Sequence, residues 1–500
     1  MPKTSLTSID FAQVPNDLEV PGSFMEFSSA NANNGAAAMP YVLLIMGQML
    51  PTGTATATVP VRITNGKAQA DQLFGQGSML STMVAAAVKV NSWTETWAVG
   101  VPDNAAGVAG AGSIAFTGTA TAAGTLTAYI GYSGLIQPAQ IAVNIGDTAA
   151  TVATNLAAAI AEVADLPVTA AVDGTTPSKV DIAARHKGQD AGNIDIRLVY
   201  YDTDLVPPGL TATVTAMTGG ATNPDQSTLI SALGDTQYHV IACPWTDAAT
   251  YSAWLTEMQR RWNALVYKEG AMVQALRGTP GTLGTQLAAM NSQFLDSYCS
   301  QNTPTAPFVE AAMIAAAYAF NLAQRPNAPQ KGTPLPGLMP PVQADRFILS
   351  ERNTLYLEGG SSWIVEKDGT VVLERAVTTY KTNASGTPDT SYHGRWTMAT
   401  LMYLRYSWVN WMNAKFPNFT LADDGTPVVA GEVTPAILGR ETFAWYKAMQ
   451  KLGLVQDAKG FYAALVSIRD LQNVSRNDQL MAPRLVPPLD IIAGQMAFVE

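Results

Sequence analysis

The sequence predicts a multidomain α/β and α+β protein. A layered α/β core is interrupted by an inserted α+β outer domain and followed by an α+β C-terminal domain, with extended N- and C-terminal arms. The first supporting observation is the length, since 500 residues are enough for roughly two to four domains. The second is that apolar runs of strand length alternate with helical spacing in two separate stretches. The third is that an Ala-, Gly- and Thr-rich segment between them alternates in polarity like half-buried strands.

Composition limits the classes of partner that the chain can bind. The chain is 47% hydrophobic but only 14% charged, whereas an average soluble domain carries about 25% charged residues. We therefore expect much of its surface to be covered. The formal net charge of −10 and the lack of a basic stripe argue against nucleic acid or an anionic membrane as a partner. The sequence contains no signal-peptide pattern and no run of roughly 20 apolar residues, so we expect a protein made in a cytoplasm.

Residues 1–35 are predicted to form an extended N-terminal arm. Pro15 and Pro21 interrupt the segment, and its apolar residues show no helical spacing. A discontinuous α/β middle domain, 36–101 plus 226–345, begins after the arm. Its first part is predicted as strand, helix and strand in the segments PYVLLIMGQM, ADQLFGQGSMLSTMVAAAVKVN and TETWAVGVP.

Residues 102–225 are predicted to form a separate inserted domain. Asp147 and Thr148 can cap the helix AATVATNLAAAIAEV with their side-chain oxygens. The segment contains eleven acidic and four basic side chains, a net charge of −7, so an outer position is expected. Its strands are predicted in GSIAFTGTA, GTLTAYIGY, IAVNI, PVTAAVD, KVDIAARH, NIDIRLVYY and LTATVTAM.

The middle domain is predicted to resume at residue 226. YHVIAC is typical of a buried strand, and Thr246 and Asp247 are candidate N-caps of a helix through YSAWLTEMQRRWNALVY. The β-α alternation continues in AMVQALRG, LGTQLAAMNS and PFVEAAMIAAAYAFNLA. The Pro- and Gly-rich segment RPNAPQKGTPLPGLMPP is predicted to be an irregular connector.

Residues 346–484 are predicted to form an α+β C-terminal domain with an open end. SWIVEKDGTVVLERAVTTY contains two strand patterns around the turn signal Asp368-Gly369. A long helix is predicted near 395–413, and further helices near 435–452.

The last sixteen residues, 485–500, are predicted to be a C-terminal β-arm. The segment LVPPLDIIAGQMAFVE is almost uncharged and resembles a loose strand. Termini fray unless another element holds them, so we expect this arm to be held by another sheet. Ile492, Met496 and Phe498 would fill one face of that acceptor.

The sequence contains no recognisable catalytic, cofactor or metal site. His186, His239 and His393 fall in different regions. On a strand, His239 and Cys243 would lie about 13 Å apart, too far for direct proton transfer. The chain lacks a GxSxG elbow, a GxxxxGK[ST] loop and an HExxH motif, and neither Cys243 nor Cys299 has metal-site spacing. We expect no enzymatic activity, cofactor or metal.

Two groups of residues invite a ligand but have a simpler interpretation. Scattered carboxylates lack calcium-loop spacing and favour a solvated acidic face: Asp181, Asp195, Asp202 and Asp204. Aromatic residues at helical spacing favour packing in a core or subunit interface over ligand stacking: Trp396, Tyr403, Tyr406, Trp408 and Trp411.

Three ordered blocks resemble the tail sheath proteins of contractile-tailed phages, most closely the Mu-like myophage group. Upstream, YHVIACPWTDAATYSAW and TAPFVEAAMIAAAYAFNLAQRPNAPQKGTPLPG are also similar, and VPGSFMEF resembles the Pro-Gly entry near sheath N-termini. The resemblance covers nearly the whole chain and is weakest in the insert. Its three blocks are VVLERAVTTYKTNASGTPDTSYH, YKAMQKLGLVQDAKGFYAALVSIRD and SRNDQLMAPRLVPPLDIIAGQMAFV.

The resemblance implies a structural virion protein, assembled in the bacterial host cytoplasm. Such a protein polymerises as stacked hexameric rings around a tail tube and contracts to drive the tube through the host envelope. The implied partners are other copies of the chain, the tail tube protein, and the baseplate and tail terminator proteins. A contractile bacteriocin or related injection system is one alternative, and an unrecognised hydrolase is another.

The resemblance also implies that both arms reach into neighbouring subunits and complete their sheets. Strand addition connects subunits through backbone hydrogen bonds and tolerates varied side chains. The expected linking residues are Val20, Phe24, Phe27, Ile492, Met496 and Phe498.

Three basic residues in GRETFAWYKAMQKLG are candidates for contact with the tube: Arg440, Lys447 and Lys451. Lys447 and Lys451 are four residues apart and share a helix face. An acidic tube would complement them, whereas the alternative is a solvated helix face.

Overall fold

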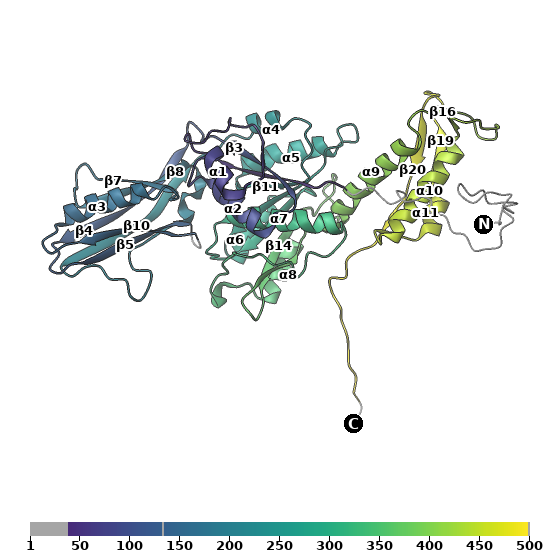
Figure 1. Cartoon of the computed structure of the whole chain (residues 1–500). Helices are drawn as coiled ribbons and strands as arrows, with labels where there is room; N and C mark the ends of the chain where they lie inside the picture. The colour runs from purple at the N-terminus through teal and green to yellow at the C-terminus, as the bar shows by residue number, and fades with distance from the viewer. Residues whose placement is uncertain (1–38, 133–134, 499–500) are drawn as a thin grey trace, which may run out of the picture. The chain divides into compact units, whose positions relative to one another are not determined.

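A computed structural model describes residues 39–132 and 135–498. Within these ranges the chain forms two compact units, one containing Met39–Arg405 and the segment from Leu485, the other containing Tyr406–Arg484. Both units combine helices and sheets (Figure 1). The predicted α/β and α+β fold class is thereby confirmed.

The larger unit is built on an eight-stranded sheet with the order β15-β14-β13-β12-β11-β1-β3-β2. The six strands from β14 to β3 run parallel, and an antiparallel strand closes each edge. Parallel strands are buried on both faces, and β1, β11, β12 and β13 are almost fully buried here. The bounds are β1 Val42–Gln48, β2 Val61–Ile63, β3 Glu95–Val101, β11 Val240–Ala242, β12 Ala271–Arg277, β13 Leu295–Ser300, β14 Gly360–Val365 and β15 Val371–Arg375.

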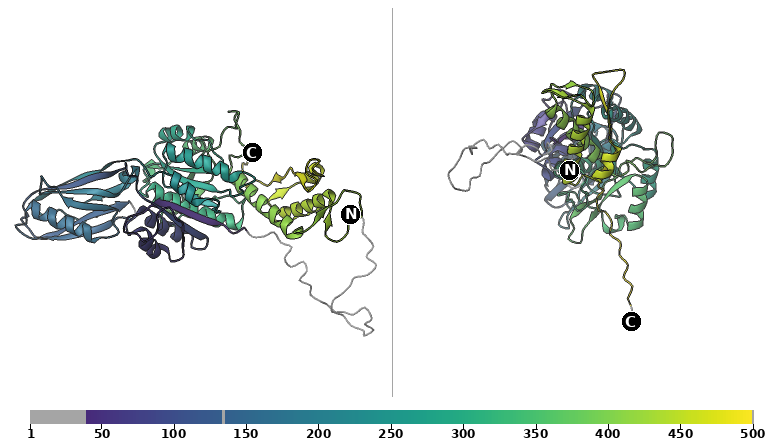
Figure 2. Two further views of the ribbon diagram at one scale, coloured as in Figure 1. Left: turned by 90° about the horizontal axis from the view of Figure 1, so that it is seen from above. Right: turned by 90° about the vertical axis from the view of Figure 1, so that its right-hand side faces the viewer.

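Helices cover both faces of this sheet (Figure 2). Successive residues of β1 enter different cores, since Leu43 packs with α2 and α7, whereas Leu44 packs with α5 and α6. Asp247 Oδ1 accepts the amide of Thr250 at 3.0 Å and caps α5, as its position predicts. The helices are α1 Gly66–Phe74, α2 Met79–Val90, α4 Ser227–Leu233, α5 Ala248–Trp262, α6 Pro280–Ala288, α7 Pro307–Gln324, α8 Leu349–Leu357 and the first part of α9 Arg395–Lys415, with a short turn η2 Gln343–Asp345.

The inserted segment forms two further sheets in the larger unit. A four-stranded sheet has the order β10-β4-β8-β7, and a three-stranded sheet the order β6-β5-β9. Thr148 Oγ1 accepts the amide of Thr151 at 3.2 Å and caps α3, as predicted. The elements are β4 Val108–Gly118, β5 Gly124–Tyr132, β6 Gln137–Val143, α3 Ala149–Glu162, β7 Val168–Val172, β8 Lys179–Lys187, η1 Gln189–Asn193, β9 Ile194–Arg197 and β10 Leu210–Ala221.

Strand β13 is an element that no sequence pattern predicted. Its sequence LDSYCS is half polar, yet all six residues are buried. The strand is possible because Asp296 binds Arg395, with nitrogen to oxygen distances of 2.6 to 2.8 Å. The polar side chains of this strand therefore find partners inside the protein.

Residues 346–405 lie in the larger unit, although 346–484 are predicted as one domain. Strand β14 pairs in parallel with β13, which makes β14 and β15 part of the eight-stranded sheet. The compact division falls between Arg405 and Tyr406, inside α9. A boundary inside a helix leaves no Pro- or Gly-rich signal in the sequence.

The smaller unit packs the end of α9 with α10, α11 and short strands. Trp445 Nε1 donates to Ser407 Oγ at 3.0 Å, and Trp408 Nε1 donates to Thr442 Oγ1 at 3.3 Å. These bonds place the α9 aromatic Trp408 in packing, as its helical spacing predicts. The elements are α10 Pro435–Lys451, α11 Ala458–Ala464, β16 Thr420–Leu421, β17 Glu432–Val433, β18 Val455–Gln456, β19 Val466–Arg469, β20 Asn477–Leu480 and β21 Arg484–Leu485.

Candidate functional site

The C-terminal arm begins with a short anchored segment. Asn327 Nδ2 donates to the carbonyl oxygen of Val486 at 3.0 Å. The Asp490 carboxylate lies 3.7 Å from Arg375 Nε. Both contacts lie within the larger unit, so the arm is attached as far as residue 490.

Beyond residue 490 the arm presents large apolar side chains to solvent. Residues 486–498 form neither helix nor strand (Figure 1). Ile492, Met496 and Phe498 are 84%, 92% and 81% exposed. In an extended chain these three residues point to the same side. The arm therefore has the exposed apolar face that a donated strand needs.

The predicted residues of the N-terminal arm, Val20, Phe24 and Phe27, lie outside the described residues. Their role in linking subunits stays a prediction.

The hairpin of β19 and β20 is a candidate acceptor for an arm. Its strands pair with each other only, so among the described residues both outer edges are open. One face packs on α10, where Ser467 Oγ donates to the Pro435 carbonyl oxygen at 2.7 Å. The opposite face exposes Val466, Ile468 and Leu480. An open edge beside an exposed apolar face is suited to strand addition.

The three basic candidates lie on the exposed side of α10. At 100° per residue, Arg440, Lys447 and Lys451 fall within an arc of about 40°, so Arg440 shares the face predicted for the two lysines. None has a carboxylate partner within ion-pair distance among the described residues, whereas Lys415 pairs with Glu441 at 2.6 Å. Lys447 Nζ lies 5.8 Å from the centroid of the Phe443 ring. The α10 surface thus carries three unneutralised positive charges.

Two of the three histidines hold backbone groups in place. His239 Nδ1 accepts the amide of Val42 at 3.0 Å, and burial, followed by the charge of Lys268, lowers the pKa of His239 to about 4. His186 Nε2 accepts the amide of Met79 at 3.1 Å, which leaves Nδ1 to donate to Asp103. Both rings therefore have structural partners.

The cysteines are buried and have no pairing with histidine. Cys243 Sγ donates to the carbonyl oxygen of Trp245 at 3.3 Å, and burial raises the pKa of Cys243 to about 12. A thiol held protonated in this way is a poor nucleophile. Across the described ranges, no group of three or more His, Cys, Asp or Glu side chains could hold a metal ion.

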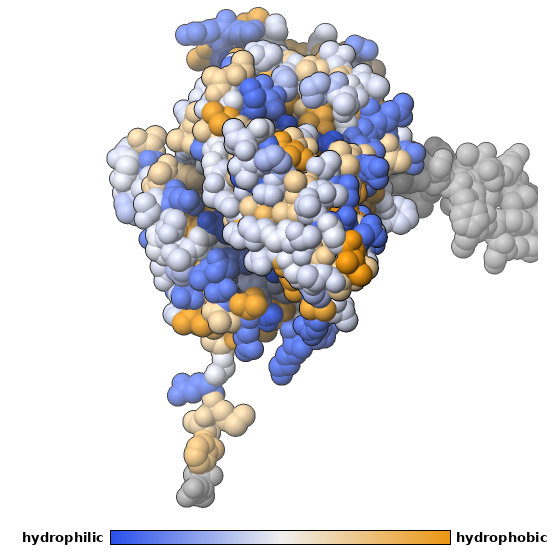
Figure 3. Space-filling model, turned by 90° about the vertical axis from the view of Figure 1, so that its left-hand side faces the viewer, coloured by the Kyte–Doolittle hydropathy of each residue, from blue (hydrophilic) through white to orange (hydrophobic). Residues whose placement is uncertain are grey.

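The acidic side chains of the insert bind their own neighbours. Asp181 pairs with Lys179 at 2.7 Å, and Asp195 pairs with Arg197. Figure 3, which views the molecule from the side of the insert, shows hydrophobic residues in small groups among hydrophilic ones. The Asp181 side chain is 50% exposed, as expected for a solvated carboxylate.

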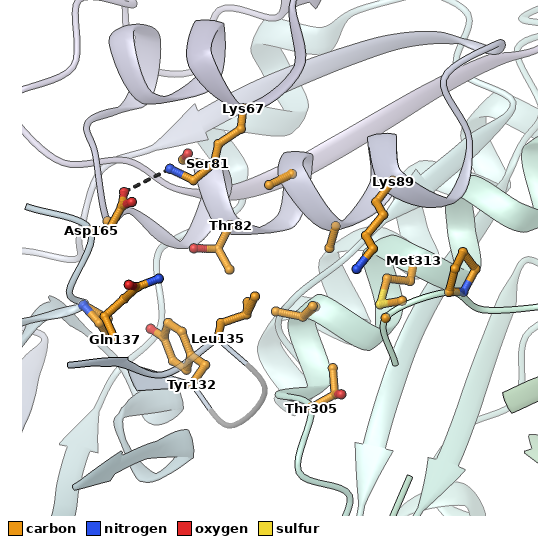
Figure 4. Close-up of a pocket in the computed structure, with 17 residues that line it drawn as sticks. Lys67, Ser81, Thr82, Lys89, Tyr132, Leu135, Gln137, Asp165, Thr305 and Met313 are labelled. Atoms are coloured by element: carbon orange, nitrogen blue, oxygen red, sulfur yellow. Dashed lines mark hydrogen bonds and ion pairs between the residues drawn. The ribbon is translucent and has the colours of Figure 1, made fainter. Parts of the chain in front are cut away.

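A cavity of about 250 Å³ lies between α2, α7 and the insert (Figure 4). Lys67 points to Asp165 at its rim, with a distance of 2.9 Å. Its wall is largely apolar and includes Val309 and Met313 of α7. The cavity lies at the seam between insert and core, and Ser81 in its lining donates its hydroxyl to the Asp71 carboxylate.

Among the described residues, no helix combines the length and the apolar composition needed to cross a membrane.

Comparison with known proteins assigns the family. The sequence pattern described as "Phage tail sheath protein central domain" matches residues 219–379. Over 494 residues the chain is 35% identical to the "Mu-like prophage FluMu tail sheath protein" of Haemophilus influenzae, a match that covers 98% of this chain and 100% of that protein. The chain therefore belongs to the phage tail sheath proteins, whose function is structural. The resemblance to the Mu-like group is thereby confirmed.

Solved sheath structures are similar over most of the chain at low identity. The sheath tail protein of Desulfitobacterium hafniense is 13% identical, with a TM-score of 0.47, over 93% of this chain and 100% of that one. The sheath tail protein of Listeria innocua is 11% identical, with a TM-score of 0.49, and the match covers 92% of this chain and 94% of that one. The helical sheath of the anti-feeding prophage in its contracted state is 10% identical, with a TM-score of 0.48, and the match covers 96% of this chain and 99% of that one.

Proposed function

We propose that this sheath protein polymerises by donating its C-terminal arm to the β19–β20 hairpin of a neighbouring copy. The observation that carries the proposal is the pair of complementary surfaces within one chain. The arm exposes Ile492, Met496 and Phe498, and the hairpin exposes Val466 and Ile468 beside open edges. Strand addition would satisfy the backbone groups of both and bury both apolar faces.

The apolar side chains of the arm determine how much free energy such a link contributes. Full burial of one large apolar side chain contributes about 1.5–3 kcal/mol. Ordering each residue of the arm opposes this by roughly 1–2 kcal/mol. A single link is therefore modest, and we infer that a sheath is held by many links acting together.

A donor and a different acceptor on each copy make a heterologous contact. Repetition of such a contact closes a ring or extends as a helix. We propose stacked hexameric rings around a tail tube, with baseplate and tail terminator proteins at the ends, in a virion assembled in the host cytoplasm. The N-terminal arm, residues 1–35, is proposed as a second link.

Contraction is proposed to draw on free energy stored in the extended assembly. A contracted state of lower free energy would drive the change without a nucleotide. We propose that the protein has no enzymatic activity and needs no cofactor. A contractile bacteriocin particle would use the same mechanics, and the presence or absence of neighbouring capsid genes separates the two.

The charge distribution suggests which surfaces face inward and outward. We propose that the insert, 102–225, faces outward because of its net charge of −7. The basic face of α10 is proposed to meet an acidic tube through Arg440, Lys447 and Lys451. Such a contact between solvated charges can break during contraction, since it buries little apolar area.

Truncation of the C-terminal arm tests the proposal, and the structure indicates at which residue the truncation should begin. Residues 486–490 contact their own unit, so deletion of 491–500 removes the free strand and keeps those contacts. We expect the truncated protein to keep its thermal unfolding midpoint but to form no long tubes by electron microscopy. The matched control replaces 491–500 with ten Gly and Ser residues. Stable, contractile sheaths made by the truncated protein would refute the proposal.

A further inference from the structure

Three tyrosines gather on the solvent side of the insert. Tyr129 lies on β5, and Tyr200 and Tyr201 follow β9. Their ring centroids are 5.4 Å apart for Tyr129 and Tyr200, 5.6 Å for Tyr129 and Tyr201, and 4.9 Å for Tyr200 and Tyr201. Both Tyr200 and Tyr201 are exposed. An exposed aromatic cluster of this kind marks a binding surface more often than a single exposed ring does.

A carboxylate fixes this cluster to the sheet. Asp204 Oδ2 accepts the amides of Tyr200 at 3.1 Å and Tyr201 at 2.8 Å, and Tyr129 Oη donates to Asp204 Oδ1 at 3.3 Å. The Arg197 guanidinium carbon lies 5.7 Å from the centroid of the Tyr200 ring. The backbone of Tyr200 and Tyr201 and the hydroxyl of Tyr129 are thus held in place before any ligand arrives, which lowers the entropy lost on binding.

The tyrosines border an open groove with a volume of about 700 Å³, within the range of small-molecule sites. Its floor is the outer face of β5 and β6, where Thr127 pairs with Gln140 and Tyr129 pairs with Pro138. Gln140 Nε2 donates to Thr127 Oγ1 at 3.2 Å. The lining combines the three tyrosine rings with the polar side chains of Thr127 and Gln140, and it also includes the apolar side chains of Ile136, Pro138 and Met339.

We propose that this groove binds a neutral carbohydrate built of hexose or N-acetylhexosamine units. One face of a pyranose ring is a plane of C–H bonds, which packs against the negative face of an aromatic ring. The sugar hydroxyls can exchange hydrogen bonds with the Tyr hydroxyls and with the Gln140 amide. The groove offers both kinds of contact side by side.

Charge selects a neutral ligand over an anionic one. Asp204 lies at the cluster, and the insert as a whole carries a net charge of −7. The Arg197 guanidinium, which lies over the Tyr200 ring, is already paired with Asp195. A phosphate, a sulfate or an acidic polysaccharide would therefore meet repulsion without a cation to bind it.

This inference goes beyond the proposed function and does not depend on it. Binding is measured on the unassembled full-length chain, so a failure to form sheaths leaves the test of the groove intact. Likewise, loss of sugar binding leaves the arm proposal unaffected.

The test uses an array of immobilised neutral oligosaccharides made of hexose and N-acetylhexosamine. We expect the wild-type chain to bind at least one of them and Tyr201→Ala to weaken that binding about tenfold, because a stacking surface is lost. Tyr201→Phe keeps the ring and is expected to retain most of the binding. The matched control is Tyr462→Ala, since Tyr462 is 55% exposed and Tyr201 57%.

Three results would overturn the proposal. One is a wild-type chain that binds no oligosaccharide on the array. Another is binding that survives Tyr201→Ala unchanged. The third is cross-linking of Tyr201 to a second copy of the chain under conditions where free sugar does not compete, which would make the cluster a contact between copies. Circular dichroism of each variant confirms that it is folded.

Discussion

At the residue scale, the buried ion pair between Arg395 and Asp296 should dominate the local stability. Both side chains are almost fully buried, and Arg395 Nη1 also donates to the Gln293 carbonyl oxygen at 3.2 Å. Arg395→Met leaves a buried carboxylate without its partner, so we expect a loss of about 3–5 kcal/mol. Urea denaturation of the full chain, monitored by tryptophan fluorescence, measures this change in the free energy of unfolding.

The control for this prediction is an exposed pair. Arg62 lies 3.7 Å from Glu95 with both side chains largely in solvent, so Arg62→Met should change stability by about 0–1 kcal/mol. Equal losses for the two variants would show that burial does not set the strength of the pair.

A second residue-scale prediction concerns pH. Burial raises the pKa of Glu310 from 4.5 to about 7, even though Trp363 Nε1 donates to its Oε1 at 2.6 Å. The folded state then binds more protons than the unfolded state between these two values, so stability falls as pH rises through that window. Glu310→Gln cannot ionise and should reduce the fall in the urea midpoint between pH 5 and pH 8.

Burial also raises the pKa of Asp190 to about 7, so part of the pH dependence should persist in this variant. Glu366→Gln, at an exposed position, is the matched control. In this variant the urea midpoint should fall with pH as steeply as in the wild type. An identical dependence of the urea midpoint on pH in the wild type and in Glu310→Gln would contradict the prediction.

Sequence position predicts local contacts well and distant ones poorly. The caps made by Thr148 and Asp247 depend on residues three positions away, and both were predictable. The Asp296 partner, Arg395, is 99 residues further along the chain. A buried aspartate is therefore recognisable only once the fold is known.

At the scale of elements, the β19–β20 hairpin should be needed for assembly but not for folding. Ile468 is more than half exposed on the face opposite α10. Ile468→Lys should leave the thermal midpoint unchanged and abolish tube formation, because a charge would be buried in the strand-addition contact. Electron microscopy and thermal unfolding of the same preparation measure both effects.

The matched control for the hairpin is Val108→Lys on β4 of the insert, a residue of similar exposure. Tubes should form normally with this variant. If both variants fail to form tubes, or if both form them, the acceptor role proposed for the hairpin is wrong.

Elements with a local pattern were predictable, but their place in a sheet was not. The Asp368-Gly369 signal gave the β14–β15 turn correctly, and Gly369 has the positive φ, 89°, that the turn needs. That β14 also pairs with β13 depends on a partner strand 60 residues upstream. An acceptor hairpin is recognised only when its open edges and exposed face are seen together.

At the scale of the whole molecule, the proposed assembly must hold its subunits together yet release its tube. Strand addition buries apolar area and resists salt, whereas a contact through Lys447 and Lys451 is screened by ions, since the Debye length is about 8 Å at physiological ionic strength. Salt should therefore separate sheath from tube before it separates one sheath subunit from the next.

Charge reversal tests this division between the two kinds of contact. Lys447→Glu with Lys451→Glu should abolish sheathing of purified tubes, because an acidic tube would then face an acidic helix. Self-assembly without tubes should continue, since the arm and hairpin are untouched. The control, Lys331→Glu with Lys367→Glu, changes the net charge equally at exposed positions elsewhere. Electron microscopy gives the fraction of tubes that are sheathed, and equal behaviour of the two double variants would show that the α10 face does not meet the tube.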